Sequence, residues 1–303
     1  MRIAIASSSM VSVPTIEAID NSEHEVICLI SAPDAIAGRG RVLTPNEFAQ
    51  WANSCGREVA KPENSAALNE ILEIAKPDVV ITIAYGKLIP EFLLNKIRYG
   101  WLNLHFSLLP RWRGAAPVQW AIKHRDVETG VTVFKLDKGM DTGPIFLKRV
   151  LRITEFATTD SLLSELSILG SAAVLDALDL LQGEIKPIPQ VEEGVTLAPK
   201  ISKMDAKIDW NRSNTEVDSH IRAMTHNPGA WTVISKNRLV INRAHPIEHD
   251  GKAGEVFRSE KAICIATSSG AIKLEIVTPE GKREMNASDW FRGARIAVGT
   301  VCE

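Results

Sequence analysis

The sequence carries little net charge, few cysteines and no long apolar run. Its 303 residues include 35 Lys and Arg against 37 Asp and Glu, a formal net charge of −2. This balance argues against a protein that coats nucleic acid electrostatically, although it leaves recognition of one RNA feature open. No stretch approaches the ~18 uninterrupted apolar residues that a membrane helix needs, so no membrane partner is expected.

The cysteines exclude two further kinds of site. Cys28, Cys55, Cys264 and Cys302 lie far apart and form no CxxC pair, so no zinc ligand set and no thioredoxin-type motif is expected. Reduced thiols are the simplest account and suit a cytoplasmic protein. The first ten residues lack a basic region followed by an apolar run, so we expect no signal peptide.

The first half of the chain alternates strand-like and helix-like patterns. Strands are predicted at residues 2–6, 25–30 and 78–84, and helices at 14–19 and 65–75. Continuous apolar strands separated by helices indicate a parallel sheet covered on both faces, and hence a Rossmann-like α/β domain. Residues 130–136 and 145–150 are expected to add a hairpin-like pair of strands to this sheet.

The second half changes in composition. Residues 158–181 have the spacing of one long helix, with a cap at Thr158 or Thr159 and a stop at Gly183. A proline-rich stretch then predicts a linker. Short β-like runs follow one further helix within 209–224. We therefore predict a first domain at 1–186, a linker at 187–206 and a β-rich, OB-like barrel at 207–303.

The charge divides unevenly between these parts. Residues 207–303 contain 14 Lys and Arg against 12 Asp and Glu, so they carry +2 and the remainder of the chain carries −4. Ordinary surface variation accounts for so small an excess, and a weak nucleic-acid face is the functional alternative.

A parallel α/β domain first suggests dinucleotide binding, but its fingerprint is missing. The GxGxxG pattern would follow the first strand, where the sequence instead has Ser7, Ser8 and Ser9. The P-loop pattern is absent as well. A nicotinamide enzyme is therefore only a distant alternative.

One dense segment carries candidate chemistry. Asn103 and His105 lie two residues apart at the end of a short apolar run, so in a strand they project from the same face. Open α/β sheets bind ligands at such strand ends. An amide beside an imidazole suits a carbonyl whose oxygen gains negative charge in the transition state.

A third group is needed to remove a proton, and Asp141 is the candidate. It lies in a tight turn between Gly139 and Gly143 that can direct one carboxylate inward. Each residue has a structural alternative: Asn103 as a turn former, His105 as a structural histidine, and Asp141 as a solvated turn residue. Their combination is what favours one catalytic cleft.

These residues belong to a longer pattern that resembles the folate-dependent formyltransferases. The pattern is Asn103-Leu104-His105, then Ser107-Leu108-Leu109-Pro110 and Arg113-Gly114-Ala115-Ala116-Pro117, with Asp141 downstream. The resemblance extends to Ala84-Tyr85-Gly86, to Gly38-Arg39-Gly40 and to Lys200-Ile201-Ser202-Lys203. It covers nearly the whole chain.

The resemblance implies a formyl donor, 10-formyltetrahydrofolate, and no metal. Asn103 and His105 would polarise the formyl oxygen, while Asp141 would take the proton of the attacking amine. Ser107, Leu108, Leu109 and Pro110 match the folate-binding stretch, and Tyr85 and Gly86 would line the pteridine pocket.

The acceptor differs within this family, and three features favour methionine on initiator tRNA. The chain has about a hundred residues more than the one-domain members that act on a purine precursor. The loop around Arg39 and Arg41 matches one that meets the tRNA acceptor arm, although a solvated surface loop is the commoner fate. The second domain is mildly basic.

Two other functions stay open. An amino-sugar nucleotide formyltransferase shares the triplet and a second domain, and a folate-binding or formyl-folate-hydrolysing module shares the first domain. For the tRNA enzyme we expect a monomer in the cytoplasm that binds folate and methionyl-tRNA.

Overall fold

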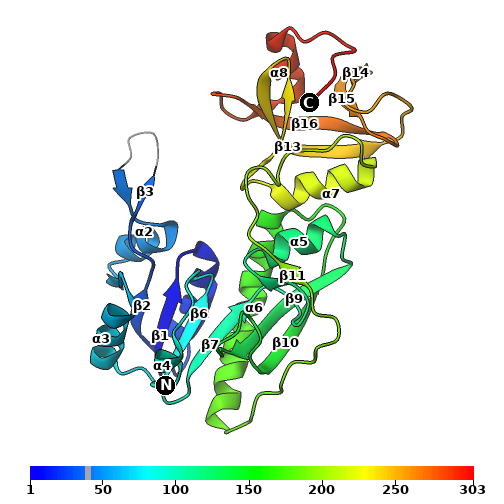
Figure 1. Ribbon diagram of the computed structural model, residues 1–303. Coiled ribbons are helices and arrows are strands. Elements are labelled where there is room, and N and C mark those ends of the chain that lie inside the picture. Colours follow the sequence, from blue (N-terminus) through cyan, green and yellow to red (C-terminus); the bar gives the residue numbers. More distant parts are fainter. Residues whose placement is uncertain (38–41) are drawn as a thin grey trace. The chain divides into compact units, whose positions relative to one another are not determined.

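The computed structural model describes residues 1–37 and 42–303 (Figure 1), and Arg39 and Arg41 lie outside these described residues. The described chain packs into two units. The first comprises Met1–Pro117, Glu128–Arg152 and Leu163–Pro199, and the second comprises Val118–Val127, Ile153–Leu162 and Lys200–Glu303. The division into 1–186, 187–206 and 207–303 stays a prediction, and the packing boundary falls inside its linker.

The first unit is built on a seven-stranded sheet. Its strands follow the order β10-β9-β7-β6-β1-β2-β5. They are β1 (Arg2–Ser7), β2 (Glu25–Ile30), β5 (Val59–Ala60), β6 (Val79–Ile83), β7 (Trp101–His105), β9 (Glu128–Lys135) and β10 (Ile145–Arg152). The five strands from β5 to β7 are parallel, whereas β9 and β10 run antiparallel to their neighbours. The predicted α/β class and its added strand pair are confirmed.

Helices cover this sheet on its two faces (Figure 1). They are η1 (Met10–Ser12), α1 (Val13–Asp20), α2 (Glu47–Ser54), α3 (Ser65–Ala75), α4 (Glu91–Leu94) and most of α6 (Thr159–Gln182). Local sequence sets where two of them begin: Asn46 caps α2, and the Asn64 side chain accepts hydrogen bonds from two backbone amides of α3. The helix predicted at 65–75 has these bounds.

The alternation of side chains decides what each face of the sheet carries. One apolar cluster joins Trp101 of β7 and Val80 of β6 to Leu68 and Leu72 of α3. Because successive strand residues point to opposite faces, Asn103 and His105 share the face of Trp101, while Leu104 faces the other way. On that other face, Leu104 lies against Gly170 of α6, where a Cβ would come within 2.7 Å of its Cδ2 atom.

The long helix α6 begins where the sequence predicts. Thr158 accepts a hydrogen bond from the Ser161 amide and donates its own amide to the Ser161 hydroxyl. At its other end the left-handed residue is Glu184 rather than Gly183. By length and composition alone α6 could cross a membrane, although it contains no uninterrupted apolar run of that length. Nearly half of its apolar stretch is buried within the protein, as in the core helix of a globular domain.

Two short strand pairs complete the first unit. β3 (Ala35–Ala37) pairs with β4 (Val42–Thr44), and β8 (Arg113–Gly114) pairs in parallel with β11 (Leu197–Ala198). The second pair shows that part of the predicted linker is an ordered element of the first unit.

The second unit is a β-rich domain with three helices. Its antiparallel strands follow the order β12-β13-β16-β15-β14, with β17 on β16. The strands are β12 (Ala230–Ile234), β13 (Asn237–Ile247), β14 (Val256–Ser259), β15 (Ala262–Ala266), β16 (Ala271–Pro279) and β17 (Met285–Asn286). The helices are α5 (Pro117–Lys123), α7 (Asn214–Met224) and α8 (Ala287–Ala294). The separate β-rich C-terminal domain is confirmed.

The last residues of the chain join the two edges of this sheet. At the β14 edge the Thr300 carbonyl accepts from the Val256 amide and the Cys302 amide donates to the Gly254 carbonyl, while Glu303 exchanges a pair of backbone hydrogen bonds with Val233 of β12. These bonds connect both edge strands of the sheet to one terminal segment, and the OB-like barrel stays a prediction. All four cysteines are free, and burial raises the pKa of the Cys302 thiol to about 12.

Helix α7 lies within the range 209–224 in which the sequence predicts one helix. A reciprocal capping box between Ser213 and Glu216 fixes its start, so Asp209–Arg212 forms a turn instead of a first helical turn.

Helix α7 also carries a buried histidine. The His220 ring is largely buried and its Nε2 atom has no hydrogen-bond partner. Burial, together with a smaller effect of the Lys123 ammonium, lowers the pKa of His220 to about 4, although a hydrogen bond with the Ala206 backbone acts in the opposite direction.

We expect Gly130→Ala to destabilise the first unit. A Cβ there would lie 2.0 Å from the Arg149 carbonyl oxygen and 2.6 Å from Leu108, so the β9–β10 pair would have to separate. The expected loss is about 1–3 kcal/mol in the free energy of unfolding, measured with urea. The control is Gly293→Ala in α8, which has open space and should stabilise by about 0.5–1 kcal/mol. A Gly130→Ala midpoint equal to wild type would contradict this packing.

We also expect the free energy of unfolding to decrease at acid pH because of His220. Between the unfolded pKa of 6.5 and the folded pKa of about 4, the unfolded chain binds one more proton at this ring. The free energy of unfolding therefore falls as pH falls through this window, by about 1.4 kcal/mol per pH unit from this group. Urea titrations at pH 7, 6 and 5 should show a shallower pH dependence for His220→Gln. Parallel curves for the two proteins would refute the assignment.

Candidate active site

Strand β7 delivers two of the predicted residues to one place. Asn103 is paired with Thr82 of the neighbouring parallel strand β6, and its Nδ2 atom donates to the Thr82 hydroxyl at 2.8 Å. The Thr82 hydroxyl in turn donates to the Leu102 carbonyl, which fixes its lone pair toward Asn103. One amide hydrogen of Asn103 is thereby used, and the amide keeps a second for a ligand.

The His105 ring is buried and its tautomer follows from its partner. Nε2 lies 2.9 Å from the Trp112 carbonyl oxygen. Because a carbonyl only accepts hydrogen bonds, Nε2 carries a proton. The other nitrogen, Nδ1, lies 3.8 Å from the Asp141 carboxylate. In a protonated ring Nδ1–H therefore faces a negative charge.

Asp141 reaches this histidine from the turn between β9 and β10. Its backbone is left-handed, with φ of +55°, and its Oδ2 atom accepts a hydrogen bond of 2.8 Å from the Gly114 amide. Gly143 is required in the same turn, since a Cβ there would lie 1.8 Å from the Lys135 carbonyl oxygen. The carboxylate is mostly buried, with 16% of its side chain exposed.

The segment predicted to bind folate is held on β9. Thr132 donates its hydroxyl to the Ser107 carbonyl and accepts from the Leu109 amide. Ser107 and Leu109 are buried, whereas Leu108 and Pro110 are partly exposed. These bonds hold the segment against β9 close to His105. Its contact with folate stays a prediction.

Tyr85 and Gly86 follow β6, next to the turn after β1. The Ser8 hydroxyl lies 3.4 Å from the Tyr85 carbonyl, so the two turns meet at the carboxyl ends of adjacent strands. Gly86 is left-handed, with φ of +75°. The Tyr85 ring is buried beside Leu93 and Trp101, its hydroxyl has no partner, and burial raises its pKa.

Sequence reasoning missed the groups that hold these residues. Thr82 is the polar residue in an otherwise apolar strand, and this exception could have identified it. Thr196 accepts from the Trp112 amide, so it supports the carbonyl that orients His105. Ala198 accepts from the amides of Ala115 and Ala116. Both belong to the stretch predicted as a linker. Its prolines indicated a connection between domains and gave no sign of these contacts.

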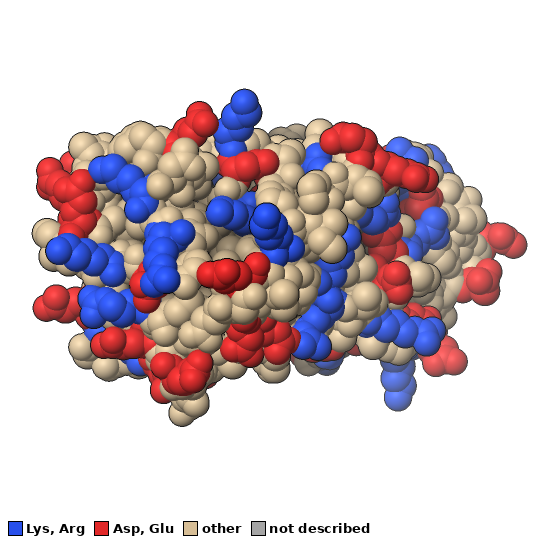
Figure 2. Space-filling model, turned by 90° about the horizontal axis from the view of Figure 1, so that it is seen from below, with Lys and Arg blue, Asp and Glu red and all other residues tan. Residues whose placement is uncertain are grey.

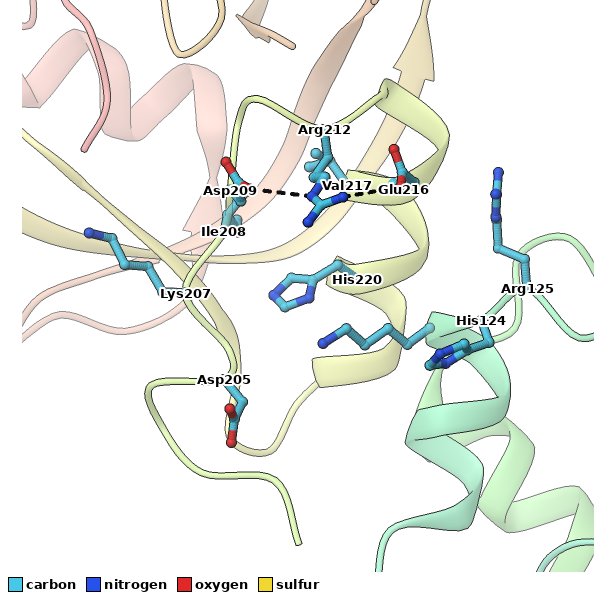
Figure 3. A pocket seen from close by; sticks show the side chains of 11 residues that line it. His124, Arg125, Asp205, Lys207, Ile208, Asp209, Arg212, Glu216, Val217 and His220 are labelled. Atoms are coloured by element: carbon cyan, nitrogen blue, oxygen red, sulfur yellow. Dashed lines mark ion pairs between the residues drawn. The ribbon is translucent and has the colours of Figure 1, made fainter. Parts of the chain in front are cut away.

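A pocket lies within the second unit, apart from the residues described above. This pocket of about 430 Å³ is formed by α7, the turn before it and the end of α5, and the His220 ring points into it from α7 (Figure 3). Arg212 is paired with Asp209 and Glu216. The pocket therefore mixes charges of both signs, as does the face of the molecule drawn in Figure 2. Asn103, His105 and Asp141 do not line it.

One group among the described residues has the composition of a metal site. The ligand atoms of Glu23, His24 and Asp179 lie within 4.8 Å of one another, and both carboxylates are on exposed residues. Burial lowers the pKa of His24. This group shares no residue with the Asn103, His105 and Asp141 site.

Comparison with known proteins covers both units. A formyl transferase family model matches residues 1–178, and a formyl transferase C-terminal domain model matches residues 200–295. The chain is 40% identical to a methionyl-tRNA formyltransferase of Salinispora arenicola, over 99% of each chain.

Two solved structures share the fold. HypX from Aquifex aeolicus in complex with tetrahydrofolic acid matches 96% of this chain and 47% of that one, with a TM-score of 0.71 and 23% identity. An N-formyltransferase from Helicobacter canadensis, in complex with folinic acid and dTDP-3-aminofucose, matches 90% of this chain and 98% of that one, with a TM-score of 0.67 and 18% identity. Family models over both units and a relative that matches from end to end lead to one conclusion: the chain belongs to the formyltransferase family.

Proposed function

We propose that this protein transfers the formyl group of 10-formyltetrahydrofolate to the α-amino group of methionine on initiator methionyl-tRNA, a step of translation initiation in the cytoplasm. The observation that carries the proposal is the meeting of Asn103, His105 and Asp141 at the end of β7 in a chain that resembles methionyl-tRNA formyltransferases from end to end.

The proposed reaction begins when the amine nitrogen attacks the formyl carbon. The carbonyl oxygen then gains negative charge, and the free amide hydrogen of Asn103 is suited to stabilise it. Because the proton on Nε2 of His105 is donated to the Trp112 carbonyl, the imidazole can donate to the oxyanion only when Nδ1 also carries a proton. In that form the site would offer one neutral and one cationic donor to the developing oxyanion.

Asp141 is the proposed proton acceptor. Its carboxylate takes a proton from the attacking nitrogen, the bond between the formyl carbon and the folate nitrogen breaks, and that proton neutralises the departing nitrogen. The Gly114 amide holds one carboxylate oxygen throughout. These residues need no metal for any of these steps.

The binding surfaces are proposed from the resemblance. Ser107, Leu108, Leu109 and Pro110, with Tyr85 and Gly86, would contact the folate. Arg39 and Arg41 would contact the tRNA. An amino-sugar nucleotide as acceptor, or hydrolysis of the formyl folate without an acceptor, remain the competing functions.

Asp141→Asn should abolish most turnover while folate still binds. Asparagine keeps an oxygen for the Gly114 amide, so the turn is preserved, but it takes no proton at neutral pH. We expect formyl transfer to fall by about 10²–10⁴-fold. Folate affinity, measured by calorimetry, should stay within a few-fold of wild type. The exposed carboxylate variant Glu155→Gln serves as the control, and turnover by Asp141→Asn at the wild-type rate would rule out the assigned role.

The acceptor is decided by a competition between substrates. Wild-type protein is given 10-formyltetrahydrofolate with initiator methionyl-tRNA, elongator methionyl-tRNA or a dTDP-amino sugar, and the formylated product is quantified. We expect transfer to the initiator tRNA at a rate at least about tenfold above the others, since discrimination of this size needs only ~1.4 kcal/mol. Transfer to the sugar alone, or folate hydrolysis without an acceptor, would replace the proposal with one of its competitors.

A further inference from the structure

The side chain of Gln190 is bonded at both ends. Its Nε2 atom donates to the carbonyl oxygens of Asp141 and Gly143 at 2.9 and 2.8 Å. Its Oε1 atom accepts from Nε and Nη2 of Arg113 at 3.2 and 2.8 Å. Two hydrogens and two lone pairs are all that a carboxamide offers, so this one is fully used.

The two groups that Gln190 joins are already joined on their other side. The Asp141 carboxylate accepts from the amide of Gly114, the residue after Arg113. The contacts therefore close a ring: Gln190 holds the Asp141 backbone, Asp141 holds Gly114, and Arg113 returns to Gln190. Every member of this ring lies in the first unit.

The Asp141 turn needs such support because its backbone is strained. A non-glycine residue with φ of +55° costs about 1 kcal/mol or more and persists only where its surroundings hold it. Two hydrogen bonds from one side chain to the carbonyls of Asp141 and Gly143 supply that support. They also leave the carboxylate itself free to face His105.

The partner of Arg113 matters for the charge at the site. Arg113 is 8% exposed, and its guanidinium meets a neutral amide oxygen of Gln190. A carboxylate in this position would satisfy Arg113 equally well, but it would repel the carbonyl oxygens of Asp141 and Gly143. Glutamine is the side chain of this length that can serve both neighbours.

We propose that Gln190 is a positioning residue for the formyl transfer described above: it sets the Asp141 carboxylate against the His105 imidazole without touching the reacting atoms. The proposal rests on the proposed function. It assigns a catalytic purpose to a stretch that the sequence indicates is only a linker.

Gln190→Glu tests the proposal, because it keeps an acceptor for Arg113 but replaces the two hydrogen bonds to the carbonyl oxygens of Asp141 and Gly143 with repulsion. We expect kcat for formyl transfer to fall about 10–100-fold, with KM for each substrate within about threefold of wild type. The exposed Gln182→Glu carries the same change of charge and should match wild type. Thermal unfolding of all three proteins checks that each is folded at the assay temperature.

A double variant distinguishes a positioning role of Gln190 from a merely structural one. If Gln190 acts through Asp141, then Gln190→Glu added to Asp141→Asn should cause less than about a twofold further loss, since the positioned group is already inactive. The NMR resonances of the His105 ring at a single pH give a readout besides turnover, and they should shift in Gln190→Glu but not in Gln182→Glu because the facing Asp141 carboxylate moves.

The outcomes are distinct. A wild-type protein that formylates no acceptor overturns the proposed function. An active wild type with Gln190→Glu at full kcat overturns the positioning role. A loss that multiplies fully with that of Asp141→Asn, with unchanged His105 ring resonances, also overturns it.

Discussion

The hydrogen bond from the Gly114 amide to the Asp141 carboxylate is the contact on which the site depends. It joins the loop that follows β7 to the turn between β9 and β10, two segments that the sheet brings to the same edge. Both residues have positive φ, and a Cβ at Gly114 would lie 2.6 Å from the Ala198 carbonyl oxygen. Glycine at position 114 thus permits both the close approach to Ala198 and the hydrogen bond from its amide to Asp141.

The same loop orients His105, so one structural unit sets both members of the pair. The Trp112 carbonyl fixes the proton on Nε2, and Thr196 holds the Trp112 amide from the other side. In the same way, the Gln190 side chain donates a hydrogen bond to the Asp141 carbonyl oxygen. The stretch from Gln190 to Ala198 therefore contacts both the loop that follows His105 and the turn that carries Asp141.

Much of the fold was open to prediction from local pattern. The apolar strands, the helix at 65–75 and the antiparallel pair β9–β10 follow from periodicity and capping alone. Local pattern is less exact about where a helix begins. The Ser213 and Glu216 capping box fixes the start of α7 within the predicted range, and the composition of α6 by itself does not distinguish a core helix from a membrane helix.

The sequence by itself determined that Asn103 and His105 share a face, because side chains alternate along any strand. It also placed Asp141 in a tight turn through its flanking glycines. Only the tertiary structure decided that this turn meets His105, since strand order brings together residues 36 positions apart. The contacts of Thr196 and Gln190 were likewise visible only in the folded chain. The prolines and acidic residues around them predict a linker, whereas their side chains bond to Trp112 and Asp141, which are distant in sequence.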